Sequence, residues 1–594
     1  MTKKLPAITI IFCLGLLVYS NSFNGSFHFD DFHYIRDNRF IRDIPNLFSH
    51  WEFYPCRFVT FLSIALNYYF NGLNLFDYHL FNLAVHCFAA FFVWWLVLLT
   101  LSTPAMKKDP ITGHGGLIAL LAGLVFVSHP VQTEAVTYIW QRTASMMAMF
   151  YLASLCFYIK SRLSFEVKEM RINYTCSLVA AVLAMFTKEN AVTLPVAVLL
   201  YEICFFEFKN INWKRLFPIL LTILIIPLTI LLTKSGNFLK AQGYIDQPKL
   251  PSESEYLLTQ FRVMATYIRL AFLPLKQNMC YDYSISKNFF EGPTLISFFF
   301  LAGVFYGALR LFSKYRLLSF AIFFFFLTLS PESSFLPLVD VIFEHRLYLP
   351  LAGYSLFLVS ALYYLLGKKG LKTMTIILTM IIAFNSILTY QRNKVWENDI
   401  TLWTDAIKKA PHHARAYYGL GEAYFQTGDF KKSILNYNEG LKIDPGYINA
   451  YINRGGDYYM LGNFPNAMAD LNKAIQIKPD VATAFYTRGD IYVKLNKLPQ
   501  AMSDYNKAIE LDPAFGAAYM NRGNICLLQG DLTGALSNYN KTIAINPDAI
   551  GAYFNRAVVN FRLKKYSEAQ SDMFKVQELQ ANSHPDENVH TEID

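Results

Sequence analysis

Charged side chains are scarce in this sequence. Asp, Glu, Lys and Arg make up 16% of its 594 residues, whereas 54% are hydrophobic; soluble domains carry about 25% charged residues. A membrane-spanning helix needs about 20 mostly apolar residues, and such runs recur until about residue 391 and then stop. The composition therefore excludes a soluble protein throughout and predicts a membrane half followed by a polar half.

Several other features are missing. The eight cysteines are scattered without a CxxC pair, which excludes a disulfide framework and a zinc site. The net charge of +9 is spread over short loops with no basic arm, so we expect no nucleic-acid partner. No spacing of two histidines and a carboxylate is present, and we expect no cofactor and no tightly bound metal. Segment 5–19 lacks a following small-residue cleavage site, so we expect a retained first span rather than a signal peptide.

The apolar runs predict about eleven spans. They lie near 5–20, 75–101, 116–128, 143–160, 173–188, 190–206, 216–233, 294–312, 317–330, 346–366 and 371–391. Alternate loops carry clusters of lysine and arginine, such as Lys107 with Lys108, and the positive-inside rule makes these loops cytoplasmic. Two further apolar stretches, 58–70 and 256–273, are expected as helices lying at the outer interface. The N-terminus is then inside and the C-terminal half outside.

The loops on the outer side hold most of the unusual polar residues of the membrane half. Ionisable groups at membrane depth are costly and usually line a site, so their recurrence at several span ends favours one shared pocket over independent surface positions. The candidate residues are Asp30, Asp31, Arg57, His129, Glu134, Arg142, Lys188, Glu189, Glu344, His345 and Arg346.

The polar half is repetitive. Prolines 411, 445, 479, 513 and 547 are spaced 34 residues apart, the period of tetratricopeptide (TPR) repeats. The fourth position from Ala414 is aromatic in every copy, and the eighth is glycine in four of five. We predict an all-α protein: a multispan domain over 1–395, a linker helix over 396–411, five TPR repeats over 412–581 forming a solenoid, and a disordered tail over 582–594.

Two columns of polar residues recur in the repeats. Asparagines occupy the sixth position and arginines the seventh: Asn453, Asn521, Asn555, Arg454, Arg488, Arg522 and Arg556. The concave face of such a stack usually holds an extended peptide or a partner's helix, and these side chains are candidates for gripping it. Asparagine is also ordinary repeat consensus at this position, and the arginines equally fit a solvated face.

An ordered series of motifs carries a family resemblance. The aspartate pair of the first outer loop, HPVQTEAV, TKENAVTLPVAVLLYE, EHRLYLP and the repeats follow one another along nearly the whole chain. Together they resemble the transmembrane and tetratricopeptide-repeat O-mannosyltransferases, which are glycosyltransferases of GT-C type. The five repeats and compact loops are similar to bacterial relatives, where donor and acceptor are less defined.

The resemblance implies a reaction. The donor would be a polyprenyl- or dolichyl-phosphate sugar, with mannose as the candidate, and the acceptor a hydroxyl, such as Ser or Thr of a protein. A carboxylate must take the proton of the attacking hydroxyl, and the family's pair maps onto Asp30 and Asp31. We assign Asp30 as the base and expect Asp31 to orient the acceptor or sit against a cation, or alternatively to cap the following helix. Cations must hold the phosphate.

The remaining candidates receive supporting roles. We rank Arg346 and Arg142 before Arg57 and Lys188 as phosphate holders. Glu134, Glu189 and Glu344 are expected to fix these cations, and His129 to be structural. Some GT-C relatives use a divalent cation, which leaves metal dependence open.

Three other functions fit parts of the sequence. A membrane-anchored scaffold for envelope assembly needs only one or two spans. A transporter of lipid-linked sugars should place polar residues near mid-span, whereas here they gather at one face. A ligase of whole glycans would share that face and stays open. The expected location is a bacterial inner membrane with the repeats in the periplasm, or alternatively the endoplasmic reticulum with luminal repeats.

Overall fold

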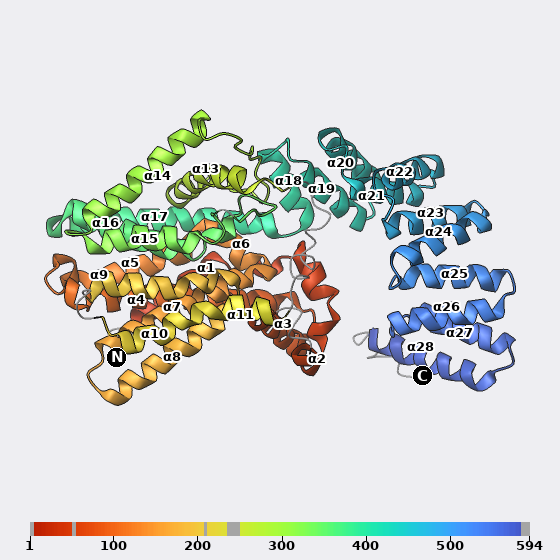
Figure 1. Ribbon diagram of the computed structural model, residues 1–594, viewed down its shortest axis with the longest axis horizontal. Coiled ribbons are helices and arrows are strands. Elements are labelled where there is room, and N and C mark those ends of the chain that lie inside the picture. Colours follow the sequence, from red (N-terminus) through yellow and green to blue (C-terminus); the bar gives the residue numbers. More distant parts are fainter. Residues whose placement is uncertain (1–4, 50–54, 207–210, 234–249, 335, 584–594) are drawn as a thin grey trace, which may run out of the picture. The chain divides into compact units, whose positions relative to one another are not determined.

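The computed structural model describes residues 5–49, 55–206, 211–233, 250–334 and 336–583, and these form helices and loops without a β-strand (Figure 1). The fold is therefore all-α, as predicted. The chain divides into two compact units, Met1–Pro411 and His412–Asp594. The tail predicted over 582–594 lies outside the described residues from 584 onward.

The first unit contains the apolar helices. Its α-helices are α1 (Leu5–Val18), α2 (Ile44–Ser49), α3 (Phe58–Asn71), α4 (Leu75–Leu101), α5 (Gly115–Ser128), α6 (Thr133–Thr137), α7 (Arg142–Leu163), α8 (Val167–Met185), α9 (Leu194–Phe205), α10 (Trp213–Leu221), α11 (Ile225–Leu232), α13 (Glu253–Phe272), α14 (Gly292–Leu311), α15 (Arg316–Leu329), α16 (Pro350–Leu366), α17 (Leu371–Asn393) and α18 (Asp399–Lys409). The helix expected as a linker is α18, and it belongs to this unit.

Each expected span coincides with helical structure. Among the described residues, six helices are long and apolar enough to cross a membrane, and α1, α15 and α16 are shorter apolar helices. Two expected spans, those at α8 and α9, fall in neither group. The count of eleven crossings stays a prediction.

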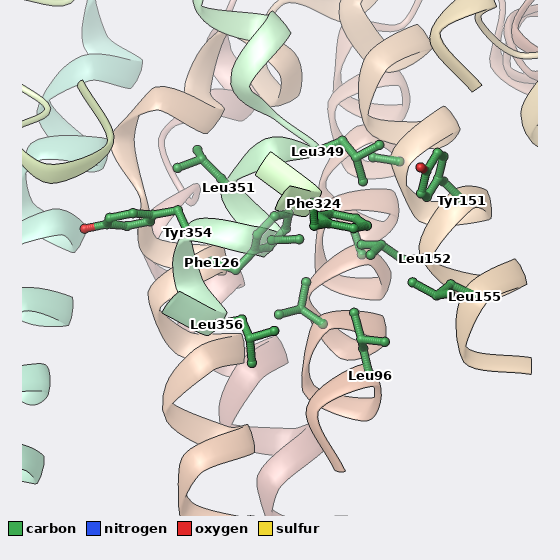
Figure 2. Packing of buried hydrophobic residues seen from close by; sticks show 14 of the residues in the cluster. Leu96, Phe126, Tyr151, Leu152, Leu155, Phe324, Leu349, Leu351, Tyr354 and Leu356 are labelled. Carbon is green, nitrogen blue, oxygen red and sulfur yellow. The ribbon is translucent and has the colours of Figure 1, made fainter. Parts of the chain in front are cut away.

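The core of the unit lies between the long helices. α4 packs against α5 and α7, and α5 packs against α1, α16 and α17. Figure 2 shows part of this core, where Phe126 of α5, Leu152 of α7 and Phe324 of α15 lie among leucines and tyrosines. Small residues permit the close approach: a Cβ on Gly353 would lie 2.8 Å from the carbonyl oxygen of Ala321.

Several apolar helices turn most of their surface away from this core. Only 17% of the apolar window of α14 and 22% of that containing α17 are buried. Apolar surface on this scale is not tolerated in water, whereas lipid covers it without penalty and leaves all backbone bonds satisfied within each helix. The chain is therefore a membrane protein.

The second unit is a series of helix pairs (Figure 1). They are α19 (Ala414–Gln426), α20 (Phe430–Ile443), α21 (Ile448–Met460), α22 (Phe464–Ile477), α23 (Ala482–Lys494), α24 (Leu498–Leu511), α25 (Gly516–Leu528), α26 (Leu532–Ile545), α27 (Ile550–Arg562) and α28 (Tyr566–Ser583). Glycine at the eighth repeat position admits the partner helix: a Cβ on Gly489 would lie 2.6 Å from the ring of Tyr505. The predicted TPR pairs are thus present.

Candidate active site

The two adjacent aspartates have different surroundings. Asp31 is fully buried, and its carboxylate accepts the backbone N–H groups of His28 at 2.9 Å and of Trp140 at 2.7 Å. The side chain of Asp30 is exposed, and its backbone N–H donates to the hydroxyl of Tyr138 at 3.1 Å. Adjacent side chains diverge, and here one fixes the loop while the other meets solvent.

Segment 129–142 contacts both the loop that carries the two aspartates and the turn formed by Glu344, His345 and Arg346. Its Tyr138 and Trp140 contact the aspartate loop. Its Glu134, on α6, accepts the backbone N–H groups of Glu344 at 3.0 Å and His345 at 3.1 Å and pairs with Nδ1 of His345 at 2.7 Å. The loop after α5 therefore connects the aspartate loop to the EHR turn before α16.

Arg142 binds groups of the protein itself, whereas we expected it to hold the donor phosphate. The side chain is fully buried, and its guanidinium donates to Asn67 at 2.7 Å, to Ser63 at 3.4 Å and to the carbonyl of Tyr78 at 3.2 Å. It also lies over the ring of Phe81. These contacts hold α3, α4 and α7 together, so its high rank as a phosphate holder is not supported by its geometry.

Lys188 and Arg346 share one carboxylate that the sequence analysis missed. Lys188 Nζ lies 3.0 Å from Glu332, and Nε of Arg346 lies 3.9 Å from the other oxygen of that residue. All three side chains are at least 86% buried. Despite burial, which raises it, the pKa of Glu332 is lowered to about 2 by the two cations. Glu332 is therefore ionised, and the cluster carries one net positive charge.

Of the other glutamates expected to bind the cations, Glu189 does so and Glu344 has different partners. Glu189 pairs with Arg57 at 3.1 Å. Glu344 instead accepts from Tyr281, from the backbone N–H of Asn278 and from Gln277 at 2.8 Å. Burial raises its pKa. It thus anchors the loop after α13 rather than a phosphate-binding cation.

His129 lies at the end of α5. It is buried, its Nε2 lies 2.9 Å from the carbonyl oxygen of Ala271, and its Nδ1 accepts the N–H of Val131. These contacts join the segment to α13 and cap its first turn, a structural arrangement.

The comparisons with known proteins can now be set beside this geometry. A family model described as TPR repeat matches residues 421–462, 455–494, 489–527 and 523–564. A protein O-mannosyl-transferase of Caenorhabditis elegans is 25% identical over 72% of this chain and 61% of its own length. The protein O-mannosyl-transferase TMTC3 of Mus musculus is 25% identical over 72% of this chain and 50% of its own. Over most of its length the chain is thus similar in sequence to protein O-mannosyl-transferases.

The match confirms the resemblance read from the motifs, and its extent is limited. The chain spans about half to three fifths of the length of these curated relatives. Among solved structures, the crystal structure of MamA is 25% identical, covers 28% of this chain and 97% of its own, and has a TM-score of 0.26.

The arginine column of the repeats is engaged within the solenoid. Arg454 and Arg488 each bind the aspartate 16 residues later, Asp470 and Asp504, through two guanidinium nitrogens. Arg556 binds Asp572 in the same way, and Arg522 binds Asn538. Aspartates thus neutralise three of the four arginines in the column.

The asparagines also bridge neighbouring repeats. Asn453 donates to Glu422 at 2.8 Å, Asn521 to Asp490 at 2.9 Å and Asn555 to Asn524 at 2.9 Å. Each partner lies one repeat earlier. Both columns therefore hold the solenoid together, and gripping a peptide would require exchanging these bonds.

An apolar cavity of about 220 Å³ lies between α13, α14, α15 and α16. Its walls include Ile268, Phe300, Val304, Phe325, Tyr354 and Phe357. Tyr267, which precedes Ile268, bonds through its hydroxyl to the backbone of Phe343, three residues before Arg346. The wall on α13 is thereby joined to the segment that carries Arg346, one member of the cluster with Lys188 and Glu332.

Proposed function

We propose that this protein is an integral-membrane glycosyltransferase. It moves a sugar, with mannose as the candidate, from a polyprenyl-phosphate donor to a Ser or Thr hydroxyl of a protein on the outer membrane face. The observation that carries the proposal is the exposed Asp30 held beside a fully buried Asp31 in a chain whose relatives are named protein O-mannosyl-transferases.

Asp30 supplies the base. Its carboxylate takes the proton as the acceptor oxygen attacks the anomeric carbon, and the bond between that carbon and the phosphate oxygen breaks with its electron pair leaving on the phosphate. Asp31 is unsuited to this step because it is buried and both of its oxygens accept backbone N–H groups. Its role is to fix the loop.

Lys188 and Arg346 stabilise the departing phosphate. Preorganised cations act most strongly in a site that excludes water. This pair has one carboxylate between two positive charges, and Nε of Arg346 is buried without a hydrogen-bond partner among the described residues. Like Arg142, Arg346 donates to protein acceptors, the carbonyl oxygens of Val341 and Asp340. The pair is preferred to Arg142 because Lys188 adds a second positive charge beside the shared carboxylate.

The isoprenoid tail occupies the cavity between α13 and α16. Its walls are apolar, and its α13 wall connects through Tyr267 to the loop of Arg346. A donor that cannot leave the bilayer would then present its phosphate at the interface, where the outer loops lie. The repeats would present the acceptor on the same side, in the periplasm of a bacterial inner membrane or the lumen of the endoplasmic reticulum.

The test compares the wild type with Asp30→Asn in nanodiscs. Each is given polyprenyl-phosphate [³H]mannose and an extract of envelope proteins, and radiolabel in protein is measured. A general base contributes about 10²- to 10⁴-fold, so we expect Asp30→Asn to lose at least about 100-fold in rate. Asp37→Asn is the matched control, because Asp37 lies in the same loop with a side chain that is 59% exposed.

The outcomes separate the parts of the proposal. Unchanged transfer by Asp30→Asn, with transfer by the wild type, would keep the reaction class and remove Asp30 as its base. Absence of transfer by the wild type from a panel of polyprenyl-phosphate sugars would contradict the function itself.

A further inference from the structure

The residue before the candidate base has an unusual backbone conformation. Phe29 has φ of 44°, in the left-handed region, which is sparsely populated by bulky residues and persists only where the surroundings impose it. Because Phe29 directly precedes Asp30, whatever holds its backbone also determines where the Asp30 carboxylate points.

Helix α18 supplies the contact that holds Phe29. Trp403 is 5% exposed, and its ring meets that of Phe29 edge-on with centroids 4.6 Å apart. On another side, the ring centroid of Phe29 lies 5.9 Å from that of Tyr138. The hydroxyl of Tyr138 accepts the backbone N–H of Asp30. The strained residue is therefore packed between α18 and segment 129–142.

A second contact joins α18 to the same loop. The buried ring of His28 lies with Nδ1 2.5 Å from Asp399 and Nε2 2.9 Å from the carbonyl oxygen of Trp396. Trp396 in turn stacks on Tyr138 with ring planes 16° apart. His28, before Phe29, is thus tied directly to Trp396 and Asp399, and Asp30, after it, is tied indirectly through Tyr138.

The far end of α18 is fastened as well. Asp405 binds Arg392 at 2.7 Å and Lys409 at 2.7 Å, and Lys409 donates to the carbonyl of Gln277. With both ends anchored, the helix has a fixed position in the first unit and is more than a tether to the repeats.

We infer that α18 is part of the catalytic apparatus, with Trp403 and Asp399 as positioning residues that aim Asp30 at the acceptor hydroxyl. This inference rests on the proposed function, because the role of Asp30 as base comes from there. Neither residue touches the reacting atoms. In the sequence the segment resembles a linker, because its contacts join residues about 370 positions apart.

The test uses the full chain in nanodiscs with Trp403→Ala, Trp403→Phe and Asp399→Asn. Thr404→Ala is the matched control, an exposed neighbour on the same helix. Transfer from polyprenyl-phosphate [³H]mannose to the envelope-protein extract gives apparent kcat and donor KM. Hydrogen exchange of segment 26–38 reports the loop independently of activity.

We expect Trp403→Ala to lower kcat at least tenfold with donor KM within twofold, and to speed exchange in 26–38 at least tenfold. Trp403→Phe, which keeps a ring against Phe29, should stay within threefold of the wild type, and Thr404→Ala should match it. The kcat and the exchange rate of Asp399→Asn should lie between those of Trp403→Ala and those of the wild type. If Trp403→Ala does not assemble, the exchange and kcat of Asp399→Asn decide.

Two results would overturn the inference: unchanged kcat despite faster exchange, or unchanged exchange and kcat together. Absence of transfer by the wild type would overturn the proposed function and the catalytic purpose given to α18. In that case the exchange data alone would show whether α18 holds the loop, so the two failures are distinguishable.

Discussion

Asp31 shows how one carboxyl group is held in a place that disfavours its charge. Burial raises its pKa to about 7, although the N–H groups of His28 and Trp140 and the charge of His28 favour the ionised form. The folded chain therefore binds this proton more tightly than the unfolded chain, whose aspartate has its ordinary pKa near 3.9. Stability from the neutral form is complete below about pH 4 and is lost as the pH rises through about 7.

This predicts a difference between the wild type and Asp31→Asn in nanodiscs. The wild-type Tm should fall between pH 5 and pH 8 more steeply than that of the variant, which has no titrating group at this position. At pH 5 the variant should have the lower Tm, because its single amide oxygen accepts only one of two N–H groups and the loss costs about 1–3 kcal/mol. Tryptophan fluorescence during heating measures both. Equal pH slopes would show that Asp31 does not change its charge in this range.

At the residue scale, the sequence could select the aspartate pair but not assign the burial of its members. The partner of Asp31 is the backbone of Trp140, 109 residues away, and no local pattern reveals such a bond. Arg142 and Lys188 cannot be told apart from the sequence, because both are basic residues in polar segments at the ends of expected spans. Glu332 was missed because it gains its meaning only from lying between Lys188 and Arg346.

At the scale of helices, apolar run length located the elements well, because a buried or lipid-facing helix must be apolar over its length. Their ends were less accessible. α9 begins at Leu194 after a 3₁₀ turn over Glu189–Thr193, and α16 begins at Pro350, which suits the first helical turn. α18 has an amphipathic pattern typical of many helices, and its role depends on contacts distant in sequence.

The helices around the apolar cavity allow a prediction about the donor. Val304→Trp on α14 replaces a small side chain in the cavity wall with an indole ring. The isoprenoid tail should then bind more weakly, while the loops of the candidate site keep their geometry. We expect donor KM to rise at least tenfold and kcat to stay within threefold. Tyr306→Trp is the control, because that side chain is 61% exposed on the same helix.

The measurement is the initial rate of transfer against the concentration of polyprenyl-phosphate [³H]mannose at fixed acceptor. An unchanged donor KM in Val304→Trp would place the tail elsewhere. A fall in kcat alone would instead indicate that the ring disturbs the loops through α13.

At the scale of the whole molecule, the division at Pro411 separates two kinds of stability. The first unit has one large apolar core, whereas the repeats are stabilised by small clusters and by bonds such as Arg488 to Asp504 that recur every 34 residues. The 34-residue period was visible in the sequence. The column of acceptors 16 residues after each arginine, aspartate in three repeats and asparagine in one, was equally visible. It became meaningful only once the paired helices showed what it binds.

This division predicts different effects of two truncations. A chain ending at residue 411 keeps α18, so segment 26–38 should retain its slow hydrogen exchange and the protein should still transfer mannose to a short Ser/Thr-containing peptide. It should lose transfer to large proteins if the repeats present them. A chain ending at 397 lacks Asp399 and Trp403. Hydrogen exchange in segment 26–38 should then become at least tenfold faster, and peptide transfer at least tenfold slower. Equal activity of the two chains would show that α18 serves only as a connection to the repeats, whereas loss of peptide transfer in both would assign the repeats a direct part in the reaction.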